Sequence, residues 1–220
     1  MVRSIINPFK FSLANFATTT ASSSQLFVLF WKAVGILELS CKLKVLAVTC
    51  DGASTNRKMF KMHFKLNDDQ DVSRDFVYRT KNLFFTDRYI FFIADQPHLL
   101  KTARNCLANS GSGTMSRYMW NNGFHLLWNH IAQMFHDDLS CGLQFFPKLT
   151  YDHIRLTSYS KMNVKLAAQV LSSTVGKTIN QYGSPEFVET ARFCCMMDSF
   201  FDIVNIRNTT EFETKSKPNL

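Results

Sequence analysis

Apolar and polar positions along the first half of the chain follow two different periods. Residues 25–40 place apolar side chains three and four positions apart, which predicts an amphipathic helix. Two short runs, 44–50 and 89–94, are rich in β-branched and aromatic residues and end at turn residues, so they predict buried strands. Residues 56–64 and 97–107 predict helices that follow these strands. This alternation of helix and strand is typical of an α/β unit.

The pattern changes after residues 109–114, Asn-Ser-Gly-Ser-Gly-Thr, which form the clearest linker of the chain. Three later segments have helical spacing and none gives a convincing strand: 124–135, 161–182 and 185–204. The sequence therefore predicts a partial α/β domain over residues 1–110 and an all-α domain over residues 111–208. A polar, flexible tail over residues 209–220 is expected to follow.

Composition favours a packed protein with an anionic partner. Hydrophobic residues make up 46% of the chain and Gly and Pro are few, at 8 and 5, so we expect a core. The net charge of +8 suits nucleic acid, although the basic residues are scattered. The six cysteines and six histidines give no zinc-site spacing. The longest apolar stretch, 26–39, is interrupted by charges and is too short to span a membrane.

Two aspartates directly follow the two predicted strands. Asp51 lies after the run 44–50, and Asp95 lies after the run 89–94. A carboxylate in this position sits where α/β sheets commonly build their sites, and hard oxygen ligands suit Mg²⁺. Two-metal nucleases need several carboxylates, so Asp51 would need partners from elsewhere in the protein. The alternatives are structural: Asp-Gly is a common turn dipeptide, and Asp95 is also well placed to cap a helix.

Two segments resemble the RNase H-like core of P-element-type transposases, including the THAP-domain transposases: 50–56, CDGASTN, and 95–105, DQPHLLKTARN. The resemblance implies that Asp51 is a catalytic aspartate and a ligand of Mg²⁺ or Mn²⁺. It also implies that Asp95 and His98 lie near the metal and that Lys101 and Arg104 contact DNA phosphate. In the alternative interpretation, Asp95 caps a helix and the two basic side chains face solvent.

Three further segments resemble the helical GTP-binding insertion of these transposases: 146–154, 161–172 and 200–205. The resemblance implies a GTP cofactor, with Lys148 on phosphate, Val164 against the base and Asp202 accepting two hydrogen bonds from the guanine edge. A plain helical core would give the same apolar spacing around Val164. Gly176-Lys177-Thr178 does not complete a P-loop, because position 171 is Leu rather than Gly.

The family activity that this resemblance implies is Mg²⁺-dependent, GTP-requiring DNA cleavage and strand transfer at transposon ends. It implies a nuclear protein without a membrane partner, and a parent that can form homo-oligomers. The family's first aspartate has no match among the 50 residues before Asp51. We also expect no match in these 220 residues to the family's glutamate, which follows the helical insertion, or to its THAP zinc module. We therefore expect these 220 residues alone not to catalyse the reaction. The alternatives are a domesticated non-catalytic DNA- or GTP-binding module and an enzyme completed in trans by another chain.

Overall fold

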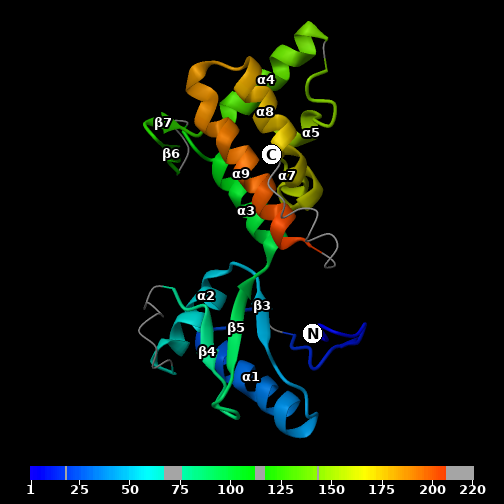
Figure 1. The fold of residues 1–220 in the computed structure, drawn as a ribbon, viewed down its shortest axis with the longest axis vertical. Helices are drawn as coiled ribbons and strands as arrows, with labels where there is room; N and C mark the ends of the chain where they lie inside the picture. The colour runs from blue at the N-terminus through cyan, green and yellow to red at the C-terminus, as the bar shows by residue number, and fades with distance from the viewer. Residues whose placement is uncertain (18, 67–75, 112–116, 143, 207–220) are drawn as a thin grey trace. The chain divides into compact units, whose positions relative to one another are not determined.

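The computed structural model describes residues 1–17, 19–66, 76–111, 117–142 and 144–206, and it divides the chain into two compact units (Figure 1). The first unit is Met1–Asp95 and the second is Gln96–Leu220. Helix α3 (Gln96–Ala108) contacts α6, α7 and α9 of the second unit. For this reason the division lies at residue 95, whereas the linker in the sequence suggested a boundary near residue 110.

A three-stranded sheet forms the centre of the first unit. Its order is β3 (Ala47–Cys50), β5 (Tyr89–Ala94) and β4 (Arg79–Lys81). Strands β3 and β5 are parallel, whereas β4 runs antiparallel to β5. The predicted strand 89–94 is confirmed, and the other predicted strand is shorter than 44–50. Because β3 and β5 are parallel, their carboxyl ends meet at the same edge of the sheet.

Two helices cover one face of this sheet. Helix α1 (Ser23–Gly35) begins with a capping box between Ser22 and Gln25 and continues into a π-helix, η1 (Ile36–Ser40). Helix α2 (Ser54–Met62) follows β3 and leads into a 3₁₀ turn, η2 (His63–Leu66). The buried core between these helices and the sheet consists of Phe30, Trp31, Val34, Val77, Ile90 and Phe92. A separate hairpin pairs β1 (Val2–Arg3) with β2 (Lys10–Phe11).

The second unit is mainly helical. After α3 its helices are α4 (Trp128–Cys141), α5 (Tyr151–Ile154), α6 (Ser158–Met162), α7 (Val164–Val170), α8 (Ser173–Tyr182), η3 (Pro185–Phe187) and α9 (Val188–Val204). The predicted helix 161–182 is broken twice. Asn163 caps α7 through the Leu166 N–H, and Ser172 caps α8 through the Val175 N–H. Short polar side chains of this kind favour helix starts over helix interiors.

The prediction of an all-α second domain is wrong in one place. Strands β6 (Trp120–Asn121) and β7 (Phe124–His125) form an antiparallel hairpin, so the helix predicted from residue 124 begins only at Trp128. The turn is Asn122-Gly123, with φ values of 48° and 84°. Asn and Gly tolerate this left-handed backbone, and Asn-Gly is a strong hairpin signal. Across the described part of the chain, no helix has the length and apolar character needed to cross a membrane.

Candidate functional site

The ends of β3 and β5 bring two carboxylates to one edge of the sheet in the first unit. Cys50 is the register partner of Ala94, and the Asp95 N–H donates to the Cys50 carbonyl at 2.8 Å. Asp51 and Asp95 are therefore the next residues on two neighbouring strands. Adjacent strands lie about 4.8 Å apart, so both backbones reach this edge side by side.

Asp51 is exposed and also organises the start of α2. Its Oδ1 accepts a hydrogen bond from the Ala53 N–H at 3.0 Å and another from Asn56 Nδ2 at 2.7 Å. This is an Asx-type turn, in which an aspartate side chain bonds to the backbone two residues on. The turn interpretation of Asp51-Gly52 is thus confirmed. Both hydrogen bonds go to Oδ1, so they fix the orientation of the Asp51 carboxylate at the sheet edge.

The residues at this edge do not make a complete Mg²⁺ site. Among the residues that the structure describes, no group of three or more His, Cys, Asp or Glu side chains converges on one point. Burial, together with the charge of Asp51, raises the pKa of the Cys50 thiol. Two carboxylates on neighbouring strands are part of the hard-oxygen set that Mg²⁺ requires.

The expectation that Arg104 faces solvent is wrong, and its expected contact with DNA phosphate stays a prediction. Its side chain is fully buried on α3, and Nη2 donates to the carbonyls of Ser160 (3.0 Å) and Lys161 (2.9 Å) in the last turn of α6. Burial lowers the pKa of its guanidinium. Arg104 therefore fastens α3 to α6 and neutralises a helix C-terminus. The sequence carried a signal for this, because Leu100, Arg104 and Leu107 share one helix face and are all buried.

The other candidates near this motif divide between the two units. Asp95 is the last residue of the first unit and is half-buried. His98 and Lys101 lie half-buried on α3, in the second unit. Their expected roles near metal or DNA stay predictions.

Lys148 lies in the loop between α4 and α5, and the first end of this loop is fixed by a buried carboxylate. Asp138 on α4 accepts the Phe145 N–H on Oδ1 at 2.7 Å and the Phe146 N–H on Oδ2 at 2.9 Å. The Phe146 ring is itself buried in the helical core. Lys148 follows two residues later and is exposed, so a fixed backbone presents its ammonium group to solvent.

The second end of this loop is attached to α7. The Thr150 N–H donates to His153 Nδ1 at 3.0 Å, which leaves the proton of His153 on Nε2. Nε2 lies 3.0 Å from Oε1 of Gln169, a residue of α7. The loop that carries Lys148 is therefore held against both α4 and α7.

Val164 and Asp202 lie on two helices that contact each other. Val164 is the first residue of α7 and is half-buried against the core, whereas Asp202 is exposed in the last turn of α9. Helix α7 contacts both α5 and α9. An exposed ammonium and an exposed carboxylate are the groups that phosphate and guanine require, so these residues fit the chemistry of GTP. Their contact with a nucleotide stays a prediction.

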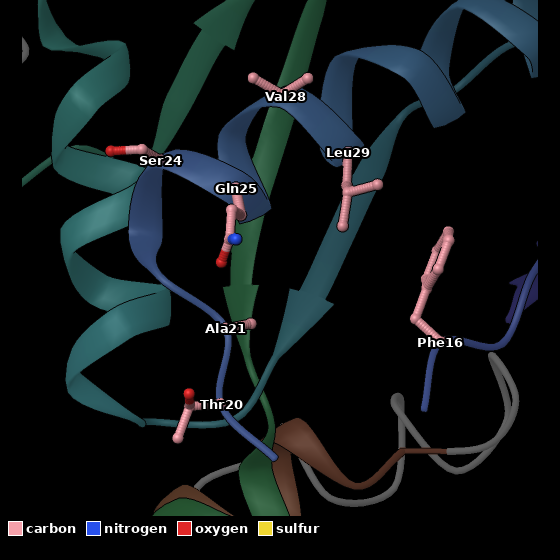
Figure 2. A pocket seen from close by; sticks show the side chains of 7 residues that line it. All are labelled: Phe16, Thr20, Ala21, Ser24, Gln25, Val28 and Leu29. Atoms are coloured by element: carbon pink, nitrogen blue, oxygen red, sulfur yellow. The ribbon is translucent and has the colours of Figure 1, made fainter. Parts of the chain in front are cut away.

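Two pockets lie elsewhere. The first, of about 540 Å³, is in the first unit, where Phe16, Val28 and Leu29 give it a mainly apolar lining without charged side chains. Figure 2 shows Phe16 on the chain segment that faces Leu29 of α1 across this opening. The second, of about 400 Å³, is bounded by α8 and α9 and includes Lys177 and Arg192. None of the predicted site residues lines either pocket.

Comparison with known proteins gives matches in both units. Residues 97–217 match a family model described as "TNP-like, GTP-binding insertion domain", and residues 1–63 match one described as "TNP-like, RNase H N-terminal domain". The chain is 32% identical over 126 residues to the transposable element P transposase of Drosophila melanogaster. This alignment covers 55% of the present chain and 16% of that protein.

A solved structure is similar in fold. The chain aligns over 87% of its length with the Drosophila P element transposase strand transfer complex, at a TM-score of 0.66 and 24% identity. It covers 40% of that chain, so it spans less than half the length of either relative. The match to the GTP-binding insertion model, in contrast, extends over more than half of the present chain. This chain therefore belongs to the TNP-like family of P-element-type transposases, with the GTP-binding insertion domain of that family in its second unit.

Proposed function

We propose that the second unit binds GTP and that the chain forms part of a P-element-type DNA transposase. The observation that carries the proposal is the match of residues 97–217 to a GTP-binding insertion domain. The fixed loop that presents Lys148 beside α7, and the contact of α7 with α9, support it.

Each of the three candidate residues has a separate role in this proposal. The Lys148 ammonium group binds the phosphates, and Val164 packs against the base. The Asp202 carboxylate accepts hydrogen bonds from N1–H and the N2 amine of guanine, which adenine does not offer in that arrangement. Charge-assisted hydrogen bonds of this kind contribute roughly 1.5–3 kcal/mol each.

The first unit takes the catalytic side of the proposal, with an RNase H-like fold and with DNA, at transposon ends, as its substrate. Asp51 and Asp95 supply part of a Mg²⁺ or Mn²⁺ site at the shared edge of β3 and β5. A two-metal site needs further carboxylates. We propose for this reason that these 220 residues by themselves do not cleave DNA. The reaction belongs in this proposal to a larger parent transposase, which is nuclear, carries a THAP module and forms homo-oligomers.

A second candidate function is a non-catalytic GTP- or DNA-binding module. The match of residues 97–217 to a GTP-binding insertion domain supports nucleotide binding and involves no catalytic residue of the first unit. The two functions differ in one respect. The module binds without cleavage in every assembly, whereas the transposase cleaves DNA once further carboxylates join Asp51.

Calorimetric titration of the purified chain with GTP and Mg²⁺ tests the proposal. Lys148→Ala and Asp202→Ala are expected to weaken binding by roughly 10-fold or more each, since each removes a charged partner. Lys58→Ala, at an exposed position on α2 of the first unit, serves as the matched control and should bind as the wild type does. Absence of any GTP binding by folded protein would overturn the proposal.

A further inference from the structure

Three exposed ring side chains gather on one face of the β6–β7 hairpin in the second unit. Tyr118 is 74% and Trp120 is 66% exposed, and His125 is exposed as well. Trp120 is the register partner of His125, and the rings of Tyr118 and His125 lie 5.2 Å apart, edge to face. Because alternate residues of a strand share a face, Met119 and Leu126 point the other way and pack with the helical core.

The hairpin that carries these rings is firmly attached to α9. The side-chain amides of Asn121 and Asn122 donate to the two oxygens of Glu189, at 2.7 Å and 3.0 Å. These hydrogen bonds lower the pKa of Glu189, and the Arg192 guanidinium 3.7 Å away balances its charge. The rings therefore stand on a fixed backbone, and Figure 1 shows the hairpin beside the helices of its unit, separate from their packed centre.

The spacing and chemistry of the rings indicate their partner. Tyr118 lies two residues before Trp120, the first residue of β6. Two residues of extended chain span about 6.6 Å, roughly twice the rise between stacked bases, and rings at that spacing match bases that have been separated rather than bases in a duplex. Flat exposed rings next to a cation are the usual platform for single-stranded nucleic acid. Arg117 is exposed and directly precedes Tyr118, and the chain carries a net charge of +8.

We propose that the outer face of the β6–β7 hairpin binds single-stranded DNA, with unpaired bases stacking on Tyr118, Trp120 and His125. Arg117 contributes a phosphate contact. This inference rests on the proposed function, from which it takes DNA as the anionic partner. It adds a second surface, separate from the candidate GTP site, and specifies single-stranded DNA as its ligand.

The test measures binding of the full chain to a fluorescent oligothymidylate of about ten nucleotides by anisotropy, within the range of site sizes seen for such surfaces. Tyr118→Ala and Trp120→Ala are each expected to weaken binding roughly 5-fold to 100-fold, the loss that follows from removing one stacked base. Trp120→Phe should keep most of the affinity, because it keeps a ring. Tyr159→Ala, at a site on α6 that is 77% exposed, is the matched control and should bind as the wild type does.

An abasic oligonucleotide of the same length separates stacking from charge. Wild type and Trp120→Ala should bind this abasic oligonucleotide equally, because only the phosphate contacts remain. An equal loss of affinity for both oligonucleotides would overturn the inference, as would unchanged binding of the oligothymidylate by both alanine variants. Loss of protein self-association in the variants, with DNA binding unchanged, would also overturn it and would assign the surface to a second copy of the chain.

The proposed function is checked on the same samples by titration with GTP. If the chain binds GTP, and the alanine variants bind the oligothymidylate as tightly as wild type does, this inference alone is contradicted. If the folded chain binds neither GTP nor either oligonucleotide, the inference and the proposed function are both contradicted.

Discussion

The guanidinium of Arg104 stabilises the second unit by bonding to two carbonyls at the end of α6. We expect Arg104→Met to lower the free energy of unfolding by about 2–4 kcal/mol, because it leaves the buried Ser160 carbonyl and the half-buried Lys161 carbonyl without their charged donor. Urea denaturation followed by circular dichroism measures the change. Arg155→Met, at an exposed position after α5, is the control and should cost little. Equal stability of Arg104→Met and wild type would show that this attachment contributes nothing.

A buried histidine makes the stability of the first unit depend on pH. His63 is fully buried among the rings of Phe27, Phe30, Trp31 and Phe92. Burial lowers its pKa from 6.5 to about 4. The unfolded chain thus binds a proton more readily than the folded one. The stabilisation is present above pH 6.5 and is lost as the pH falls toward 4.

This shift predicts a loss on the order of 3 kcal/mol in the free energy of unfolding between neutral pH and pH 4. Denaturation curves recorded across this range should show a smaller pH dependence in His63→Gln than in wild type. His136→Gln, at an exposed position on α4, should keep the wild-type dependence. An identical pH profile for His63→Gln and wild type would contradict the predicted proton linkage.

The close packing of α8 on α9 depends on Gly176. A Cβ atom at this position would lie 2.5 Å from Cys195 Sγ and 2.6 Å from the Ala191 carbonyl oxygen. We therefore expect Gly176→Ala to destabilise the second unit by roughly 1–3 kcal/mol, as overpacking usually does. Thermal unfolding compares it with Thr174→Ala, an exposed change on the same helix. A melting temperature equal to that of Thr174→Ala would mean that α8 and α9 accommodate the added methyl group without loss of stability, and it would contradict the prediction.

At the level of elements, the sequence was informative where the periodic pattern was strong. Strand β5 and helices α1, α3 and α9 follow their apolar spacing closely, and the aspartates that follow β3 and β5 could be located for the same reason. The breaks between α6, α7 and α8 were missed because apolar spacing continues across Asn163 and Ser172, whose side chains start new helices. The β6–β7 hairpin was missed although Asn122-Gly123 signals it, because the neighbouring apolar residues also fit a helix.

Across the whole molecule, the sequence could identify chemistry-bearing residues but not the contacts made by long-range packing. Asp138 accepts hydrogen bonds from the loop before Lys148, and Glu189 accepts them from the hairpin. Both sets of hydrogen bonds join positions that no local sequence pattern relates. The same holds for Arg104, whose motif suggested a surface role and whose helix face places it in the core. The contacts of Asp138 and Glu189 position the second unit's candidate nucleotide and DNA surfaces.

The central claim is that the second unit recognises guanine through Asp202. Guanine presents two donors to a carboxylate, whereas xanthine presents one donor and one acceptor, which match the amide of an asparagine. Equilibrium binding of GTP and xanthosine triphosphate to wild type and to Asp202→Asn therefore tests the claim most directly. We expect wild type to prefer GTP and Asp202→Asn to prefer xanthosine triphosphate, each by roughly 10-fold or more. Failure of wild type to bind GTP, or the same preference in both proteins, would contradict the account.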